Sequence, residues 1–168
     1  MLSYKITDKP MAKKDDVFSD ENIIPSNWVS WGTPVEDKIF GTLIRKFKTT
    51  SNYDGKEKTV ENYELKADFG SYHKLDDKKN PVEPAIEVVA NEFYNIGGKD
   101  SIEKQMRNIK VGQKIGFKFI EETPSKVKGH APAKIIKVFA PKNDDGSFKM
   151  DEEWLSEQGS DLNEEFDK

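Results

Sequence analysis

The stretch TVENYELKADFGSYHKL, residues 59–75, constrains the fold more than any other part of the chain, because apolar and polar side chains alternate along it. The apolar set is Tyr63, Leu65, Ala67 and Phe69, and the intervening polar set is Glu64, Lys66 and Asp68. A period of two places each set on its own face of an extended strand. We therefore predict a half-buried antiparallel strand with a hydrophobic core on one side.

The residues that precede this stretch predict its partner strand. Residues 38–50, KIFGTLIRKFKTT, are rich in β-branched and aromatic side chains around an internal Gly41. The residues that follow contain Asp54-Gly55, a pair typical of the two-residue turn of a hairpin because it tolerates positive φ angles. We expect residues 38–50 and 59–75 to form that hairpin.

Three more strands and one short helix are expected beyond the hairpin. The strands are AIEVVANEFYNI (85–96), VGQKIGFKFIEE (111–122) and AKIIKVFAP (133–141), and the helix is KDSIEKQMRNIK (99–110). Ile102, Met106 and Ile109 recur at helical spacing in the helical segment. The order of three strands, one helix and two strands is that of the OB-fold, a five-stranded, partly open Greek-key barrel. The predicted fold class is therefore all-β with one helix.

Charge of opposite sign is separated along the chain. Residues 142–168 carry ten acidic and three basic side chains, whereas residues 38–141 carry 20 basic and 14 acidic ones. A cationic body with an anionic tail is typical of a protein that binds polyanions and whose tail can screen its own binding surface. We divide the chain into a flexible N-terminal extension (1–26), an OB-fold nucleic-acid-binding domain (27–141) and an acidic tail (142–168).

The tail is predicted to be disordered, because it is too acidic and too poor in β-branched residues to bury a core. A short helix over residues 150–158, capped by Asp151, is the alternative interpretation. Large apolar side chains among the carboxylates are natural anchors for the pocket of a partner protein. We predict that Trp154, Leu155 and Phe166 are the partner-binding residues of the tail.

Aromatic side chains divide into a core set and a surface set. Those on the alternating apolar faces are predicted to be core, namely Tyr63, Phe69, Phe117, Phe119 and Phe139. Tyr53 and Tyr72 lie among polar residues near loops, so we predict that they stack on bases. Trp28 and Trp31, in IIPSNWVSWGTP, are expected to pack on the domain, with a base-stacking role as the alternative.

Basic residues gather near the two loops that would flank an OB-fold groove. Lysine and arginine neutralise backbone phosphates and aromatic rings stack on bases, a combination that binds single strands with little sequence preference. The predicted single-stranded-DNA-binding residues are Arg45, Lys46, Lys48, Tyr53, Lys56, Lys58, Tyr72, Lys74, Lys126, Lys128 and His130. Any one of these lysines alone is expected to be an ordinary solvated charge, so the prediction depends on their concentration.

Catalytic and metal-binding signatures are not found in the sequence. The chain has no cysteine and two histidines, His73 and His130, without metal-ligand spacing. Gly97-Gly98 is expected to be a turn rather than a phosphate-binding loop, and Asp76-Asp77 lies among lysines. We therefore expect no enzyme activity, metal or cofactor. Without disulfides, a signal peptide or a membrane-length apolar run, a soluble cytoplasmic protein is expected.

Three segments resemble the single-stranded DNA-binding proteins of bacteriophages and of phage-derived metagenomic sequences. They are YELKADFGSYHKLDDKKNPVEP (63–84), GGKDSIEKQMRNIKVGQKIGFKFIEE (97–122) and KGHAPAKIIKVF (128–139), and the resemblance extends over residues 27–155. This family pairs an OB-fold with an acidic tail that has an aromatic residue at or near its end. NEEFDK is similar to such a tip, although Asp167 and Lys168 follow Phe166. The resemblance implies a protein that coats single-stranded DNA during phage replication or recombination and recruits partners through its tail.

Two other functions remain open from the sequence. One is a protein interaction module on the same barrel, such as a phage structural or host-takeover protein, and a weaker one is a carboxylate-dependent nuclease. Affinity that falls steeply with salt distinguishes a phosphate-binding protein from an apolar protein interface. A homo-oligomer is compatible with the sequence, and no membrane partner is expected.

Overall fold

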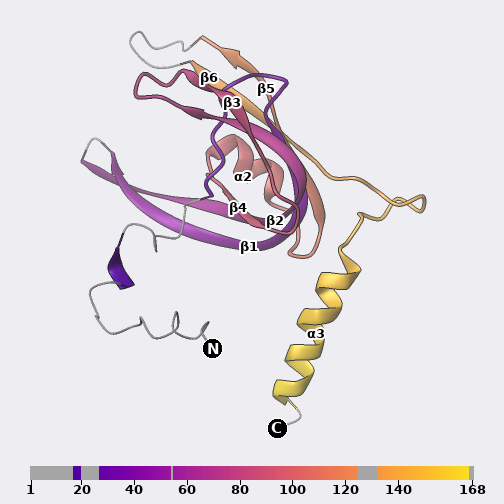
Figure 1. The fold of residues 1–168 in the computed structure, drawn as a ribbon. Coiled ribbons are helices and arrows are strands. Elements are labelled where there is room, and N and C mark those ends of the chain that lie inside the picture. Colours follow the sequence, from indigo (N-terminus) through magenta and orange to yellow (C-terminus); the bar gives the residue numbers. More distant parts are fainter. Residues whose placement is uncertain (1–16, 20–26, 54, 125–131, 167–168) are drawn as a thin grey trace, which may run out of the picture.

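The computed structural model describes residues 17–19, 27–53, 55–124 and 132–166, and it is built on one six-stranded antiparallel sheet with two helices (Figure 1). The strands are β1 (Lys38–Tyr53), β2 (Lys56–Leu75), β3 (Pro81–Glu87), β4 (Phe93–Ile96), β5 (Lys114–Thr123) and β6 (Ala133–Phe139), and the helices are α2 (Asp100–Met106) and α3 (Glu152–Phe166). The order of the strands is β3-β2-β1-β5-β6, and β4 also pairs with β2. The structure is therefore mainly β, as predicted.

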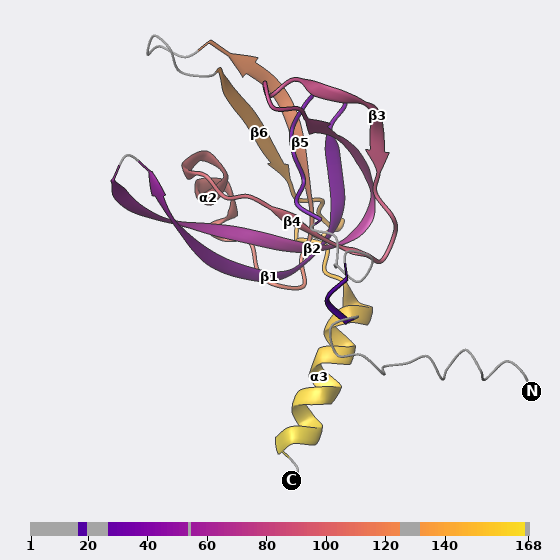
Figure 2. The same ribbon diagram turned by 60° about the vertical axis from the view of Figure 1, so that its left-hand side comes forward.

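The predicted hairpin is confirmed as β1 and β2. Tyr53 pairs with Lys56, and Gly55 adopts φ 75°, as a two-residue hairpin turn requires. The strands are longer than predicted, at 16 and 20 residues. Because residues 48–52 and 55–59 are exposed, this end of the hairpin forms a two-stranded arm that extends beyond the core (Figure 2).

The prediction of one third strand over residues 85–96 is wrong, because this region forms two strands joined by a tight turn. β4 pairs with residues 63–66 of β2, and β3 pairs with residues 71–75 farther along the same strand. Between them Asn91 adopts φ 71°, and its backbone N–H donates to Ala67 O at 2.7 Å. Asparagine tolerates this left-handed conformation better than most residues, so the chain turns there.

The sheet is open at β6, where helix α2 takes the place of a neighbouring strand. In the described residues β6 pairs only with β5. The side-chain amide of Gln105, on α2, donates to Ile136 O and accepts from Val138 N–H, both at 2.9 Å. Lys99 Nζ donates to Lys134 O at 2.5 Å on the same strand. These side chains satisfy backbone groups that a strand neighbour would otherwise pair. The described strands form an open sheet, so closure into the predicted, partly open OB-fold barrel is not confirmed.

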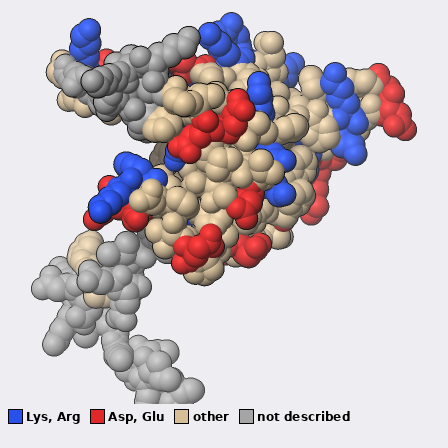
Figure 3. Space-filling model, turned by 90° about the horizontal axis from the view of Figure 1, so that it is seen from above, with Lys and Arg blue, Asp and Glu red and all other residues tan. Residues whose placement is uncertain are grey.

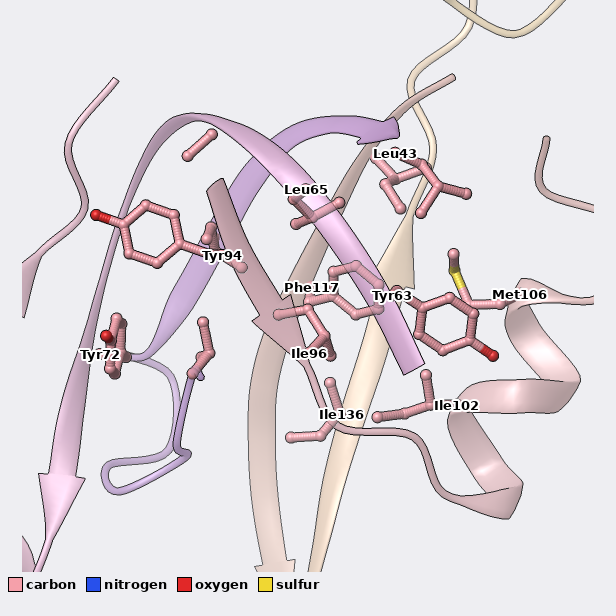
Figure 4. Close-up of a cluster of buried hydrophobic side chains, with 14 of the residues drawn as sticks. Leu43, Tyr63, Leu65, Tyr72, Tyr94, Ile96, Ile102, Met106, Phe117 and Ile136 are labelled. Atoms are coloured by element: carbon pink, nitrogen blue, oxygen red, sulfur yellow. The ribbon is translucent and has the colours of Figure 1, made fainter. Parts of the chain in front are cut away.

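The core lies between the inner face of the sheet and α2 (Figure 4). Ile102 and Met106 reach into it from α2, at the spacing that the sequence predicts for a helix, although α2 is shorter than residues 99–110. Tyr63, Phe117 and Phe119 are each no more than 1% exposed. Three of the five predicted core aromatics are therefore confirmed.

The prediction that Phe69 is a core residue is wrong, because β2 contains a bulge. Phe69 pairs with Phe40, whereas Ala67 pairs with the adjacent Gly41. Asp68 is therefore an extra residue on β2, and an extra residue reverses the alternation of faces. The ring of Phe69 consequently points to the outer face of the sheet and is 58% exposed.

The prediction that Phe139 is a core residue is also wrong, because the register of β6 places it on the other face. Val138 pairs with the buried Phe117 and packs against the core. Phe139 is the next residue along β6 and pairs with Gly116. Since neighbouring residues of a strand point to opposite faces, Phe139 lies on the outer face, where it is 50% exposed.

The part of the tail that the structure describes contains a capped helix. Helix α3 starts at Glu152, and Trp154 N–H donates to Asp151 Oδ1 at 3.0 Å. This side-chain cap satisfies one of the free N–H groups at the start of a helix. The alternative of a helix capped by Asp151 is therefore confirmed and the prediction of disorder is wrong for this segment, since α3 extends to Phe166 and points away from the sheet (Figure 1).

The first part of the tail is also attached to the domain. Lys114 N–H donates to Lys149 O at 2.9 Å, where the tail runs beside β5. The side chain of Leu155 packs on Gly112. The contact is so close that a Cβ at Gly112 would lie only 2.6 Å from Leu155 Cδ2. Residues 142–155 thus belong to the folded domain, which the predicted boundary at residue 141 did not include.

The segment before β1 packs on the domain, as predicted for Trp31. Trp31 is 9% exposed, whereas Trp28 is 41% exposed and meets Phe47 edge-on, with ring centroids 5.9 Å apart. Val29 N–H donates to Asn95 O at 2.9 Å, which holds this segment beside β4. Of the predicted N-terminal extension, residues 1–26, the structure describes only residues 17–19.

Candidate nucleic-acid interface

Arg45, the first predicted DNA-binding residue, is engaged within the protein. Its Nε lies 3.0 Å from Glu64 Oε1, and its guanidinium carbon lies 4.3 Å from the centroid of the Phe47 ring. The side chain of Arg45 is 55% exposed, so it is accessible, but Glu64 balances much of its charge. A phosphate at this position would have to compete with that carboxylate.

Lys46 and Lys48 lie in a groove of about 480 Å³ between the β1-β2 arm and α2. The groove is lined by Lys46, Lys48, Thr59, Val60, Glu61, Glu103 and Arg107. Lys46 Nζ donates to Met106 O at 3.0 Å, and Glu103 Oε1 accepts from Glu61 N–H at 2.7 Å. Three cations face two carboxylates, so the groove carries little net positive charge for an anion.

The other predicted cations are spread over the molecule. Lys56 and Lys58 are exposed at the end of the arm, and Lys74 is exposed on β2 where it pairs with Val82 of β3. Outside the described residues lie Lys126, Lys128 and His130, together with the side chains of Tyr53 and Phe166. Among the residues that are described, the predicted cations therefore do not form one continuous track.

The surface position predicted for Tyr72 is wrong. Its side chain is 4% exposed and packs edge-on against Tyr94, with ring centroids 6.4 Å apart. Burial raises the pKa of Tyr72, and the neighbouring Tyr94 adds to this rise. Tyr72 belongs to the buried core cluster, so its ring has no open face for a base.

Four residues form a row across the outer face of the sheet, which we call the phenylalanine row. Its members are Phe69 on β2, Phe40 on β1, Gly116 on β5 and Phe139 on β6, and each pairs directly with the next. Phe40 and Phe69 stack with ring centroids 5.4 Å apart. Large aromatic rings gathered on an exposed face indicate a binding surface, because their contact with water is unfavourable.

A second row lies two residues along the same strands, and we call it the lysine row. Its members are Lys38 on β1, Lys118 on β5 and Lys137 on β6, again paired directly. In the described part of the chain none of them forms an ion pair with a carboxylate. Like charges directly opposite each other on neighbouring strands are destabilising. The lysine row is therefore an unbalanced strip of positive charge, which suits a polyanion.

Charge on the opposite flank of the phenylalanine row is balanced within the protein. Lys114 Nζ lies 2.6 Å from Asp68 Oδ2 and donates to Thr42 Oγ1 at 3.2 Å. Thr42 Oγ1 in turn donates to Asp151 Oδ2 at 2.6 Å. Burial acts to raise the pKa of Asp151, but hydrogen bonds from Thr42 and from Trp154 N–H outweigh it and lower that pKa. An anionic ligand is therefore favoured on the flank of the lysine row.

A buried pair, Asp37 and His73, fixes the loop before β1 onto β2. His73 Nδ1 lies 2.7 Å from Asp37 Oδ1, and the two side chains are 3% and 0% exposed. Asp37 Oδ2 also accepts backbone N–H groups from Gly32 and Thr33. The hydrogen bond with Asp37 raises the pKa of His73 against the opposing effect of burial, and the charges of Asp37 and Glu83 add to the rise. These bonds give the pair a structural role.

Sequence reasoning missed the phenylalanine row. Phe40 was not singled out, and Phe69 and Phe139 were assigned to the core. The available signal was Gly116, because glycine in the interior of a strand often marks a place where a ligand or another backbone approaches closely. The lysine row was missed because its members come from three strands whose register the sequence does not reveal.

Comparison with known proteins gives no relative. No protein-family model matches the chain, and no curated protein or solved structure matches it either. In the described ranges, no group of three or more His, Asp or Glu side chains is placed to hold a metal, and no helix is both long and apolar enough to cross a membrane. Figure 3 shows Lys and Arg in separate groups among Asp and Glu on the face that it presents. The function is therefore argued from local geometry.

Proposed function

We propose that the chain binds single-stranded DNA, without preference for base sequence, on the outer face of its sheet. The observation that carries the proposal is the lysine row beside the phenylalanine row. Lysines supply affinity by neutralising phosphates, and exposed aromatic rings supply it by stacking on bases. The two rows are about 7 Å apart along the strands. One strand of DNA therefore reaches both, with its phosphates over the lysines and its bases over the phenylalanines.

A single strand suits these rows better than a duplex does. Stacking on Phe69 or Phe139 requires an exposed base face, which a duplex keeps inside its own stack. The hollow beside these rings is lined by Lys, Ile, Phe and Gly side chains, which offer no carboxylate, amide or hydroxyl group to read base edges. Sequence preference is accordingly expected to be weak.

The strand order supports an OB-type framework for this site. β1 pairs with both β2 and β5, β5 pairs with β6, and α2 lies between β4 and β5 in the chain, as in an OB-fold. We propose that α2 fills the seam that a closed barrel would close by strand pairing. Together with the resemblance of three segments to phage single-stranded DNA-binding proteins, this favours a role in phage DNA replication or recombination, with α3 as the element that recruits partners.

A protein interaction module is the second candidate, because exposed phenylalanine rings also bind apolar protein surfaces. The lysine row favours DNA over this alternative. An apolar protein partner would leave three adjacent cations uncompensated, whereas phosphates balance them.

A binding titration tests the proposal directly. Labelled oligo-dT, a matched duplex and an RNA strand of the same length are titrated with the full chain at several salt concentrations. We expect oligo-dT to bind more tightly than the duplex, with a logarithmic salt slope of about −0.7 for each phosphate contact. Equal affinity for oligo-dT and duplex, or affinity that salt does not change, contradicts the proposal. Incubation of labelled DNA with magnesium and the protein tests the nuclease alternative, and intact DNA is expected.

A further inference from the structure

We infer that the phenylalanine row contains a pocket for one nucleobase, lined by Phe139 and by the stacked pair of Phe40 and Phe69. The inference rests on the proposed function and assigns one base of the bound strand to a place in it. It concerns a hollow of about 220 Å³ in the outer face of the sheet.

The shape of the hollow follows from the exposure of the four residues. Phe69 and Phe139, at the two ends of the row, are 58% and 50% exposed. Phe40 is half-buried and Gly116 is buried between them. The rings of Phe40, Phe69 and Phe139 all line the hollow, and a second hollow beside them extends past the end of β6. A flat ring that enters the hollow therefore meets aromatic carbon.

Gly116 lies against the ring of Phe40. A Cβ at this position would lie 3.2 Å from Phe40 Cδ1 and 3.9 Å from Phe139 Cβ, so a side chain there would displace the Phe40 ring at the edge of the hollow. The backbone of Gly116 is not among the positive-φ positions, so its conformation does not require glycine. Glycine otherwise weakens a strand interior, and its presence here is explained by the close approach of the Phe40 ring.

The chemistry of the lining selects the ligand. The charged residues of the hollow, Lys38 and Lys118, both lie on the flank of the lysine row, and the rest of the lining is apolar. A nucleotide matches this arrangement, because its base is planar and its phosphate is anionic. A second copy of the chain, packed with the same face, would bring its own lysines against these, and like charges across an interface are unfavourable.

The test uses the full chain and two labelled probes of equal length. One probe is oligo-dT, and the other is a strand whose bases are replaced by abasic sites. Phe139→Ala removes one wall of the hollow. Phe93→Ala is the matched control, because Phe93 on β4 is 51% exposed and lies outside the hollow. Gly116→Val displaces the Phe40 ring at the edge of the hollow without removing it, and its circular dichroism and Tm are compared with those of the wild type.

We expect Phe139→Ala to weaken oligo-dT binding about tenfold, with no change for the abasic strand and none for Phe93→Ala. Folded Gly116→Val should show a similar loss of oligo-dT affinity.

If the wild type binds the abasic strand as tightly as oligo-dT, the base pocket is overturned while phosphate binding by the lysine row stands. If it binds neither strand at low salt, both proposals fail. If Phe139→Ala turns a dimer into a monomer in sedimentation but leaves oligo-dT affinity unchanged, the hollow belongs to a second copy and the inference is overturned.

Discussion

A single extra residue in β2 determines much of the character of the outer face. Because Asp68 is bulged, Phe69 turns outward and stacks on Phe40. The carboxylate of Asp68 itself lies 2.6 Å from Lys114 Nζ and balances the charge on that flank. One bulge thus exposes an aromatic ring and also leaves the lysine row as the flank with unbalanced charge.

The buried pair of His73 and Asp37 makes the stability of the fold depend on pH. The folded-state pKa of His73 is raised, chiefly by its hydrogen bond with Asp37, above the unfolded value of about 6.5. Its stabilising effect is therefore fully present below about pH 6.5 and is lost as the pH rises through the folded-state pKa. We predict that the Tm of the wild type falls as the pH rises from about 6.5 through the folded-state pKa of His73. His73→Gln should lower the Tm at low pH and make the Tm depend less on pH.

Thermal melts across this pH range check the prediction, and Glu83→Gln is the control. Glu83 Oε1 lies 3.1 Å from His73 Nε2, but its side chain is 78% exposed, so its contribution is screened and a smaller effect is expected. Parallel Tm curves for the wild type and His73→Gln would show that the pair does not control this pH dependence.

At the level of elements, the open edge of β6 depends on one side chain of α2. Gln105 both donates to Ile136 O and accepts from Val138 N–H. Gln105→Leu leaves both groups without these partners, and we predict a loss of about 2 kcal/mol in the free energy of unfolding. Gln105→Glu keeps an acceptor for Val138 N–H but has no donor for Ile136 O, so its loss should be smaller.

Urea unfolding and hydrogen exchange measure this effect. The Val138 amide should exchange faster in Gln105→Leu than in Gln105→Glu. Unchanged exchange of that amide in both variants would mean that Gln105 does not protect the edge.

The tail divides at the element level into an attached part and a projecting part. Removing residues 142–168 breaks the bonds of Asp151 with Thr42 and of Lys149 with Lys114, together with the packing of Leu155 on Gly112. We predict that this truncation costs at least about 2 kcal/mol in the free energy of unfolding. Removing residues 160–168 touches none of these contacts, so its unfolding curve in urea should match that of the full chain. Equal stability of the two truncated chains would contradict the docking of residues 142–155.

The sequence predicted the elements whose signals are local. The Asp54-Gly55 turn, the α2 spacing of Ile102 and Met106, and the last two strands follow from short patterns. The division of the third strand was not predictable, because it depends on the turn at Asn91, whose backbone N–H donates to Ala67 O of β2.

The binding surface was predicted less well than the fold. Its rows are created by the bulge at Asp68 and by pairing between β1, β5 and β6, which are distant in sequence.

The whole molecule presents one covered face and one open face. The inner face of the sheet carries the core and α2, while the outer face carries the phenylalanine row and the lysine row. The acidic helix α3 leaves the domain next to Thr42, on the flank where charge is already balanced. The acidic helix therefore starts on the flank opposite the lysine row, where phosphates are proposed to bind.

The salt dependence of DNA binding tests this arrangement most directly. The triple variant Lys38→Gln, Lys118→Gln, Lys137→Gln is compared with a variant in which three exposed lysines elsewhere, Lys78, Lys104 and Lys110, are changed to glutamine. Both variants lose the same net charge, so they differ only in where it is lost. We predict that the first flattens the logarithmic salt slope for oligo-dT by about 2, as expected for three lost phosphate contacts, and that the second leaves it nearly unchanged. Equal slopes for the two variants would contradict phosphate binding by the lysine row.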